Sequence, residues 1–352
     1  MQNNYSNKEG DFLKKTGINI NNGFDKKSLL SKSVSIIIPF YNNLKIFQKC
    51  FLALQHQYIP DRIKDKIELI IIDDGSAPNQ KRVLANFLQK ENKLFNITLL
   101  QFLSNRGRAI ARNTGILHAK GEVIIFLDSD ILAEKYLIVN HLLRHQFSEK
   151  IAIIGFRENI NYNNNSIRSQ KLRKGILPKP DYKKDFRYKK FVPANWKNVY
   201  RDIADTQFNK TYFLLKDTEF FKNFTSSEMH GVWTLPFMFL TCNVSVERKE
   251  AIKVGGFDMN FKGWGVEDTH FAYKLLKNKV FLVPVISAIS FHIKHNNQKD
   301  NERKIQDYKK NLALYKIKTR VRQKKYRTKE WEKRLKTAVG EKYNLIKILP
   351  KK

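Results

Sequence analysis

Cysteine is nearly absent from the 352-residue sequence, which holds only Cys50 and Cys242. Two cysteines cannot build a disulfide framework, and neither has a second thiol close by in the sequence to begin a zinc site. The longest apolar stretch, at about residues 280–291, is interrupted by Pro284 and is shorter than the roughly 20 residues that a membrane-spanning helix needs. The N-terminal segment lacks the apolar region of a signal peptide. We therefore expect a cytoplasmic protein, either soluble or peripheral at the inner face of the membrane.

Acidic residues are also scarce, with 33 Asp and Glu against 66 Lys and Arg, so the formal net charge is +33. Such a surplus indicates an anionic partner: nucleotide phosphates, nucleic acid or a membrane surface. A lysine-rich surface that serves only solubility has the same composition, and charge alone does not separate these readings. Hydrophobic residues make up 42% and aromatic residues 12% of the chain, which favours a packed globular fold over a disordered one.

Short apolar runs alternate with helical patterns in the first part of the chain. Runs rich in Ile, Leu and Val occupy residues 34–39, 68–73, 97–102 and 122–127, and each is typical of a buried strand. Strands that alternate with helices form parallel sheets with helices on both faces. The sequence therefore predicts an α/β protein with a Rossmann-like, doubly wound, mostly parallel sheet.

Two carboxylates follow the last of these strands, where Asp128 and Asp130 flank Ser129. Residues two apart in an extended segment point to the same side. Ligands of open α/β sheets bind beyond the carboxyl ends of the strands, and paired carboxylate oxygens suit a divalent cation. We expect a cation site here; the alternative is a cap for a following helix.

Other polar residues are predicted to reach the same crevice. Asp73 and Asp74 end the second strand and would either contact a ligand or cap the next helix. Arg106 and Arg112 lie on the turn and helix before the strand that leads to Asp128. Guanidinium groups suit stacking on bases and contacts to diphosphates, although exposed arginines can also be merely solvated.

A second acidic motif lies in the later, glycine-punctuated segment 263–268. Glu267 and Asp268 precede a predicted helix, whose dipole favours their ionised form, and an ionised carboxylate is what a general base needs. Trp264 stands between two glycines, where its ring would either support a sugar or pack in the core.

Two histidines, His292 and His295, follow the last predicted strand at a spacing of three. Imidazole in a mixed oxygen and nitrogen site suits Mn²⁺ better than Mg²⁺. The pair therefore adds candidate metal ligands, while a purely structural role stays open for each.

In this order, the motifs resemble those of family 2 glycosyltransferases, which have the GT-A fold. Residues 34–41, 72–76, 105–115 and 127–130 are similar to the nucleotide-sugar half of that family. Residues 263–268, together with the two histidines, resemble the acceptor half of its galactosyl- and N-acetylgalactosaminyltransferase branch.

The resemblance covers roughly residues 33–300 and implies a division of the chain. Residues 33–150 would form the nucleotide-sugar half and residues 151–300 the acceptor half. A polar lead, residues 1–32, precedes them, and a basic helical tail, residues 301–352, follows.

The resemblance also implies individual roles. Asp130 would be the direct metal ligand and Asp128 would contact the ribose, or the metal through water. Asp73 would bind the nucleobase, typically uracil. Asp268 would be the catalytic base and Glu267 would hold the acceptor.

The other residues that the resemblance brings in are donor-side and acceptor-side candidates. The donor side adds Pro39, Tyr41, Asp74, Asn105, Arg106, Arg112 and Ser129; the acceptor side adds Trp264 and Gly265; His292 is the first and His295 the second candidate for a further metal ligand.

These roles predict a metal-dependent inverting glycosyltransferase. It would use a nucleotide diphosphate sugar, most simply a UDP-sugar, with Mn²⁺ as cofactor and Mg²⁺ as the alternative. The acceptor hydroxyl would belong to a glycan, a lipid-linked glycan or a peptide. The competing hypothesis is a basic nucleic-acid-binding protein without catalysis, but it gives no role to the two acidic motifs.

The basic tail carries apolar residues mostly at four-residue steps, which predicts an amphipathic helix. They are Ile317, Val321, Trp331, Leu335, Val339 and Tyr343. This apolar stripe would either contact a membrane surface or a partner, or pack on the catalytic domain; the sequence leaves both readings open.

Overall fold

The structure is a computed structural model that describes most of the chain. The described residues are 31–145, 149–161, 165–173, 178–187, 213–215, 230–232, 236–294, 298–340 and 343–351. Much of the predicted polar lead, residues 1–32, lies outside them, as does His295.

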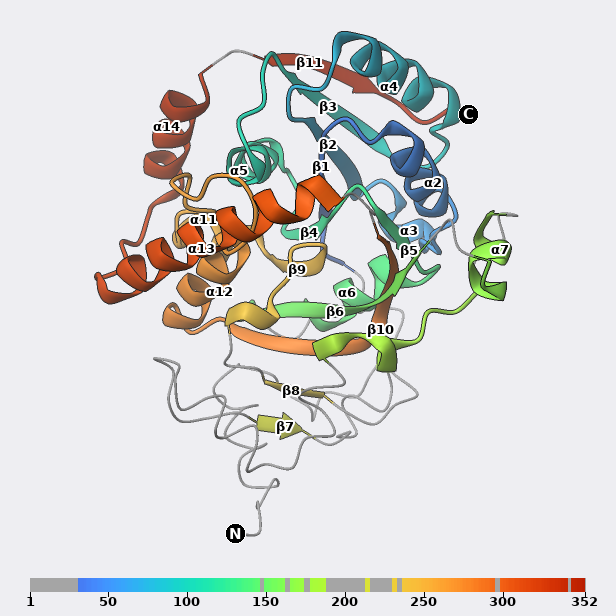
Figure 1. Cartoon of the computed structure of the whole chain (residues 1–352). Coiled ribbons are helices and arrows are strands. Elements are labelled where there is room, and N and C mark those ends of the chain that lie inside the picture. Colours follow the sequence, from blue (N-terminus) through green and yellow to red (C-terminus); the bar gives the residue numbers. More distant parts are fainter. Residues whose placement is uncertain are drawn as a thin grey trace.

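A nine-stranded sheet forms the centre of the described part, in the order β11-β3-β2-β1-β4-β9-β6-β10-β5 (Figure 1). Its strands are β1 (Val34–Phe40), β2 (Ile67–Asp73), β3 (Asn96–Phe102), β4 (Val123–Leu127), β5 (Ile131–Ala133), β6 (Ile151–Ile160), β9 (Asn243–Glu247), β10 (Phe281–Ile293) and β11 (Tyr343–Ile348). The first four strands are mutually parallel, and β6 and β10 run in the same direction; only β5, β9 and β11 run the other way. The prediction of a mostly parallel α/β sheet is confirmed.

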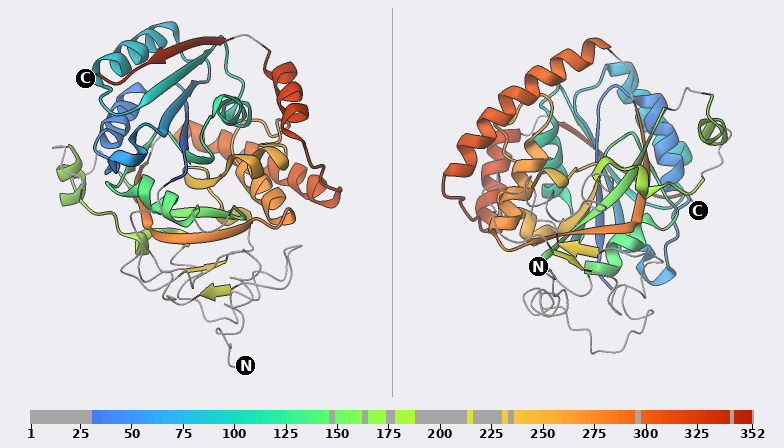
Figure 2. Two further views of the ribbon diagram at one scale, coloured as in Figure 1. Left: turned by 180° about the vertical axis from the view of Figure 1, so that it is seen from behind. Right: turned by 60° about the horizontal axis from the view of Figure 1, so that its bottom comes forward.

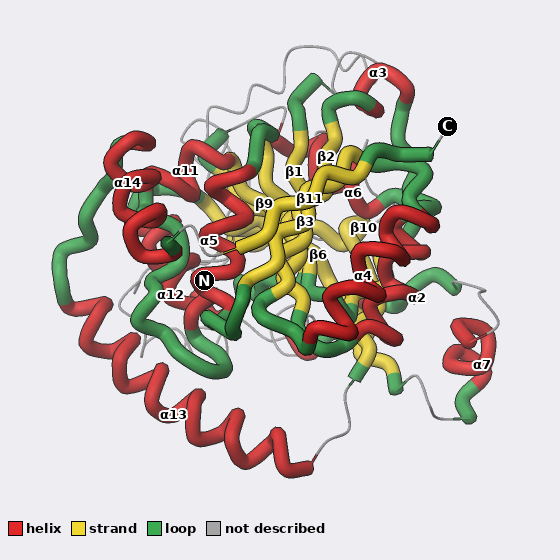
Figure 3. Tube along the Cα trace, turned by 90° about the horizontal axis from the view of Figure 1, so that it is seen from above, coloured by secondary structure: helices red, strands yellow, loops and turns green. Residues whose placement is uncertain are grey.

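Helices cover both faces of this sheet, as Figure 3 shows from above. One side carries α5 (Arg108–His118), α11 (Arg248–Lys253), α12 (Glu267–Lys277), α13 (Gln298–Arg320) and α14 (Thr328–Val339). The other carries α2 (Leu44–Leu54), α3 (Asp61–Lys64), α4 (Pro78–Glu91) and α6 (Leu137–His145). Smaller elements are α7 (Ile167–Arg173), η1 (Tyr182–Lys184), η2 (Pro236–Met238) and the separate pair β7 (Phe213–Leu215) and β8 (His230–Val232).

The strands read as continuous apolar runs because both of their faces are buried. In β1, Ile37 belongs to the hydrophobic cluster under α5 and α12, whereas Ile36 and Ile38 belong to the cluster under α2, α4 and α6. Alternate residues of one strand therefore pack into two separate cores.

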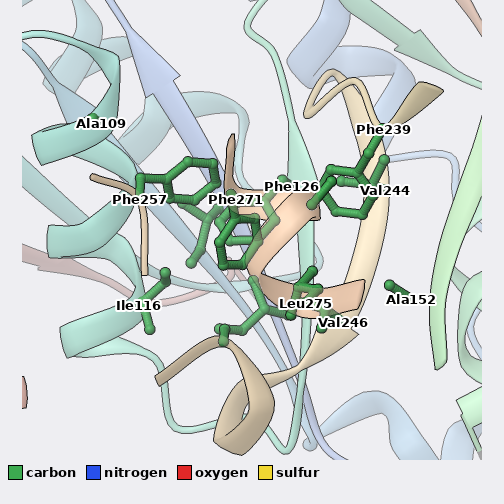
Figure 4. Packing of buried hydrophobic residues seen from close by; sticks show 14 of the residues in the cluster. Ala109, Ile116, Phe126, Ala152, Phe239, Val244, Val246, Phe257, Phe271 and Leu275 are labelled. Atoms are coloured by element: carbon green, nitrogen blue, oxygen red, sulfur yellow. The ribbon is translucent and has the colours of Figure 1, made fainter. Parts of the chain in front are cut away.

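Three aromatic rings form the centre of the core on the α5 side (Figure 4). Phe257 stacks on Phe271 with ring centroids 4.3 Å apart, and Phe126 of β4 meets Phe257 edge to face at 5.3 Å. The rings come from the strand that leads to Asp128, from the loop before α12 and from α12 itself. This packing fixes α12 against the end of β4.

The C-terminal segment packs on the sheet, and its last part differs from the predicted helix. Trp331, Leu335 and Val339 of α14 are buried in the α5-side core. Tyr343 begins strand β11, which pairs antiparallel with β3 at the edge of the sheet (Figure 2). A helix cannot satisfy the open backbone groups of an edge strand, whereas another strand can. Packing on the rest of the fold is therefore the reading that holds for α14 and β11.

Among the described residues, no helix combines the length and the apolar character that crossing a membrane would require.

Candidate active site

Asp128 and Asp130 lie in the short connection between the end of β4 and the start of β5. Strand β10 pairs antiparallel with β5, which places His292 opposite Ile131. As a result, His292 Nε2 lies 3.6 Å from Asp130 Oδ2, although the two are 162 positions apart in the sequence. The predicted proximity of the carboxylate motif and the first histidine is present in the fold.

The ring of His292 is oriented by Asn159 of β6, whose Oδ1 lies 3.0 Å from His292 Nδ1. An amide oxygen is only an acceptor, so Nδ1–H donates to Asn159 in this contact, and Nε2 is the ring nitrogen that faces Asp130. A second partner of this kind is usual for metal-binding histidines. Asn159 has no sequence signal of its own, because only the β6–β10 register brings it opposite His292.

A divalent cation fits this donor set if the substrate completes it. Within the described part of the chain, no group of three His, Cys, Asp or Glu side chains is arranged to hold a metal by itself. Asp130 would offer a hard oxygen and His292 a nitrogen, a pair that suits Mn²⁺. His295 lies outside the described residues.

Arg112 joins the two acidic motifs. Its guanidinium donates to Asp128 Oδ1 and to Glu267 Oε1, at 2.9 Å in each case, and its side chain is only 1% exposed. Burial by itself lowers the pKa of Arg112, but the carboxylates of Asp128 and Glu267 outweigh it and raise the pKa above its ordinary value. The guanidinium also lies over the ring of Phe257, 5.5 Å from its centroid. Arg112 thus connects the end of β4 to the start of α12.

Asp268 follows Glu267 in the first turn of α12 and accepts a hydrogen bond from the backbone N–H of Thr269 at 2.8 Å. Burial raises its pKa to about 7, the charge of Glu267 adds to the shift, and Arg112 opposes it. The helix dipole led us to expect the opposite direction. That dipole contributes about 0.3–1 kcal/mol at exposed ends, which desolvation and a neighbouring carboxylate exceed here. A carboxylate with a pKa near neutrality is suited to general base catalysis.

The loop before α12 needs glycine at two positions. Gly263 and Gly265 have φ of 72° and 87°, and Val266 at the N-cap is also left-handed at 73°. This backbone turns Trp264 outward, so that 38% of the residue is exposed. The alternative of core packing for Trp264 does not hold, and Gly265 lies within the same exposed loop.

Asp73 and Asp74 at the end of β2 have different surroundings. Asp73 Oδ1 accepts from the Ser76 backbone N–H at 2.9 Å, while its buried Oδ2 has no hydrogen-bond partner. Burial raises the pKa of Asp73. Both oxygens of Asp74 are used, by the backbone N–H groups of Arg106 at 2.7 Å and Gly107 at 2.9 Å. Asp74 therefore organises the neighbouring loop, whereas one carboxylate oxygen of the fully buried Asp73 has no hydrogen-bond partner.

Burial also raises the pKa of Asp74, to about 6, against the two backbone hydrogen bonds. The side chain of Asn105 donates to the Asp74 carbonyl oxygen at 3.1 Å, so it too supports this loop.

Arg106 points away from these carboxylates. Its guanidinium donates to the carbonyl oxygens of Ala338, at 3.1 Å, and Val339 at the C-terminus of α14. A cation at a helix C-terminus satisfies free carbonyls and interacts favourably with the dipole. A contact between Arg106 and a donor, as predicted from the sequence, requires these bonds to break.

The remaining donor-side candidates lie around the same edge of the sheet. Pro39 is a partly exposed residue of β1, and Tyr41 follows the strand and is exposed. Ser129 is partly exposed between the two aspartates. Their positions are compatible with the predicted ligand contacts, which stay a prediction.

An open cavity of about 570 Å³ lies between the donor-side turn and the acceptor-side loop. Its lining residues are Ser104, Asn105, Arg106, Gly107, Ile110, Lys262 and Gly263. The loops that the sequence singled out as separate motifs thus face a common space.

Two family profiles match most of the described sequence motifs. The profile described as Glycosyl transferase family 2 matches residues 35–208, and the one described as N-terminal domain of galactosyltransferase matches residues 235–296. The uncharacterized glycosyltransferase YfnE of Bacillus subtilis (strain 168) is 26% identical over 287 residues, which cover 79% of this chain and 68% of the relative. Chondroitin synthase of Escherichia coli is 25% identical over 272 residues, but these cover 76% of this chain and only 36% of the synthase.

Solved structures with a similar fold share less sequence. GalNAc-T7 with UDP, GalNAc and Mn²⁺ superposes with a TM-score of 0.55 at 17% identity, over 78% of this chain and 45% of that one. Mannosyltransferase PcManGT from Pyrobaculum calidifontis, in complex with GDP-Man and Mn²⁺, gives 0.53 at 16% identity, over 88% and 70%. At such identities the likeness establishes the fold. With the profile matches and the curated relatives, it identifies this chain as a glycosyltransferase of family 2 with the GT-A fold.

Proposed function

We propose that the protein is a metal-dependent inverting glycosyltransferase that transfers a sugar from a nucleotide diphosphate sugar to an acceptor hydroxyl. The observation that carries this proposal is the buried bridge through Arg112, which holds Asp128 and Glu267 at 2.9 Å each. The shared guanidinium links Asp128 to Glu267, the neighbour of the candidate base Asp268, which supports a single site built from both motifs. The acceptor hydroxyl belongs to a glycan, a lipid-linked glycan or a peptide.

The donor is proposed to be a UDP-sugar. Asp73 Oδ2 is a buried acceptor without a partner, which suits an N–H of a nucleobase such as N3–H of uracil. The fold neighbour GalNAc-T7 was solved with UDP, whereas PcManGT was solved with GDP-Man, so the fold accepts both bases. The single unpaired oxygen of Asp73 favours a base such as uracil, which presents one N–H to it.

Asp130 and His292 are proposed to hold the divalent cation, Mn²⁺ with Mg²⁺ as the alternative, and Asp128 would orient the donor ribose or bind the cation through water. When bound, the cation neutralises the negative charge that develops on the departing diphosphate. Asn159 keeps His292 Nε2 directed at this position, and Arg112 restrains Asp128. Both fold neighbours contain Mn²⁺, which supports the choice of metal.

Asp268 is proposed to act as the general base. Its carboxylate takes the proton of the acceptor hydroxyl, and the resulting oxygen attacks the anomeric carbon on the face opposite the diphosphate. The bond to the diphosphate oxygen breaks, so the anomeric configuration inverts without a covalent enzyme intermediate. Glu267, fixed by Arg112, would hold the acceptor, and Trp264 would lie beneath a sugar ring.

The division of the chain is also a proposal: a nucleotide-sugar half at residues 33–150, an acceptor half at residues 151–300 and a C-terminal segment at residues 301–352. The C-terminal segment supports the sheet through α14 and β11.

The proposal is tested by nucleotide diphosphate release from a panel of UDP- and GDP-sugars, with Mn²⁺, with Mg²⁺ and with EDTA. We expect turnover of at least one UDP-sugar with Mn²⁺ and none with EDTA. Asp130→Ala and Asp268→Asn should each lower kcat by at least about a hundredfold, because each removes a group that acts at the reacting atoms. NMR of the product should show the opposite anomeric configuration to the donor.

Asp65→Asn is a matched control, since Asp65 is an exposed carboxylate in the turn after α3. It should leave turnover unchanged. A product with the anomeric configuration of the donor would contradict inversion. Full activity of Asp130→Ala, or of the wild type in EDTA, would contradict the proposed metal dependence.

A further inference from the structure

Helix α13 (Gln298–Arg320) lies beyond both family matches, which end at residues 208 and 296. It nevertheless packs along α12 and reaches the loop that carries Trp264 (Figure 1). An element outside both profile matches thus touches a loop that lies inside the second one.

Two residues one turn apart on α13 bind the backbone of this loop. The Nδ2 group of Asn311 lies 2.9 Å from the carbonyl oxygens of Lys262 and Gly265 and 3.3 Å from that of Trp264. Asp307 Oδ2 accepts from the Trp264 backbone N–H at 3.1 Å. Asn311 is buried, so its amide has little access to water as an alternative partner. Four backbone groups of a short, exposed loop are therefore held by one face of α13.

Glycine is required at positions 263 and 265 for two reasons. Both have positive φ, and both lie close to side chains of α13. A Cβ atom on Gly263 would overlap the carboxylate of Asp307, and one on Gly265 would lie 3.2 Å from Cδ2 of Tyr308. The Gly-Trp-Gly sequence and α13 are thus mutually fitted surfaces.

The contact leaves two aromatic rings exposed side by side. Trp264 is 38% exposed and Tyr308 is 44% exposed, with ring centroids 6.1 Å apart and ring planes inclined at 49°. Because the ring planes are inclined to each other, the two rings form an open, concave apolar surface, which we call the apolar corner. Such a corner matches the C–H face of a pyranose ring, which binds aromatic surfaces while its hydroxyls stay in water.

We propose that α13 completes the acceptor site: Tyr308 and Trp264 together bind a sugar ring of the acceptor, and Asp307 and Asn311 are positioning residues for Trp264. The inference rests on the proposed function and narrows it, because it makes the acceptor a saccharide rather than a peptide. It adds a residue from the C-terminal segment to a site otherwise built from residues 263–268.

Binding is tested by saturation-transfer NMR with the full-length protein and a panel of free mono- to tetrasaccharides, with a Ser/Thr-containing peptide as comparison. We expect saccharide binding that Tyr308→Ala weakens about two- to twelvefold, the equivalent of the roughly 0.5–1.5 kcal/mol that an aromatic contact contributes. Tyr308→Phe should bind like wild type. Tyr58→Ala is the matched control, because Tyr58 also belongs to an exposed tyrosine pair, with ring centroids 5.4 Å from Tyr136, after α2.

Catalysis separates this inference from the proposed function. With an active donor, Tyr308→Ala should raise KM for a saccharide acceptor and leave the slow transfer to water unchanged. Absence of any donor turnover counts against the proposed function, whereas saccharide binding that depends on Tyr308 still upholds the inference. Donor turnover with a peptide acceptor only, or saccharide binding indifferent to Tyr308→Ala, overturns the inference.

The positioning role has its own readout. Asn311→Ala should speed hydrogen exchange at residues 262–266 and lower kcat with the acceptor, while KM for the donor stays unchanged. Exchange at wild-type rates in this loop would show that Asn311 does not hold it.

Discussion

At the scale of single residues, Arg112 explains why two motifs far apart in sequence lie at one place. Its charge is buried between Asp128 and Glu267, and each contact is a charge-assisted hydrogen bond. Buried ion pairs contribute little net stability compared with apolar packing, but a buried charge without its partner is strongly unfavourable. We therefore attribute to Arg112 the alignment of the two acidic motifs.

Replacement of Arg112 by lysine should expose this role. Lysine keeps the charge but cannot reach two carboxylates with a planar fork, so at least one of the two contacts is lost. We expect kcat to fall about ten- to hundredfold, since one hydrogen bond to a charged group is worth about 1.5–3 kcal/mol. Arg108→Lys is the matched control, because Arg108 is the exposed first residue of the same helix. Equal rates for the two variants would refute the alignment role.

Asp268 gives a prediction for the pH dependence of the rate. Its pKa is raised to about 7, mainly by burial, and only the ionised form can accept a proton. The acceptor-dependent kcat/KM should therefore rise with pH and be half-maximal near pH 7, and this activity should be lost as the pH falls. A rate that stays constant from pH 5 to 8 would exclude Asp268 as the base.

The raised pKa of Asp268 affects stability in the opposite direction: higher pH increases activity but lowers stability. A carboxyl whose pKa is raised in the folded state favours folding while it is protonated, and this contribution is lost as the pH rises from about 4 to about 7. Asp268→Asn removes the titrating group, so its melting temperature should exceed that of wild type at pH 8 and match it at pH 4. A constant difference across this range would mean that Asp268 has its ordinary pKa.

At the scale of elements, α14 decides between the two readings of the C-terminal segment. Trp331 is buried in the same core as α5, whereas Ile317 on α13 is exposed. Trp331→Ala should lower the free energy of unfolding by about 3–5 kcal/mol, as large core truncations do. Ile317→Ala should change it by less than about 0.5 kcal/mol, as is usual at the surface. Urea denaturation of both variants checks this, and similar midpoints would show that α14 does not belong to the core.

The elements also show what a sequence can predict. Strands β1 to β4 were predictable because burial on both faces gives uninterrupted apolar runs. The C-terminal pattern was ambiguous because four-residue spacing continues from Val339 to Tyr343, although the chain changes there from helix to an edge strand. That change depends on the free edge of β3, a property of the whole sheet.

The site divides in the same way. The sequence alone could single out Asp128, Asp130, Glu267 and Asp268 as candidates because they stand in short local motifs at the ends of elements. The position of Asn159 depends on strand register, and the contacts of Arg112 depend on helix packing on the sheet. No local sequence pattern predicts either of them. The direction of the pKa shift at Asp268 likewise follows from burial, which a sequence does not give.

At the scale of the whole molecule, family membership makes the chain an enzyme, which removes the hypothesis of a nucleic-acid-binding protein without catalysis. The net charge of +33 then needs another role. The cavity between the donor-side and acceptor-side loops includes Arg106 and Lys262 in its lining. A strongly positive protein with cations at such an opening raises the local concentration of a negatively charged nucleotide sugar.

The positive electrostatic field of the protein predicts that salt weakens binding of the nucleotide sugar but not of a neutral acceptor. The screening length falls from about 30 Å at 0.01 M to about 8 Å at 0.15 M ionic strength, so attraction of the donor should weaken over this range. We expect KM for the nucleotide sugar to rise severalfold between these conditions at saturating Mn²⁺. A neutral saccharide acceptor carries no charge to be screened, so its KM should stay constant and serves as the internal control. If both KM values rise together, salt acts on the fold or the metal and not on donor attraction; if neither rises, the charge of this protein has no part in donor binding.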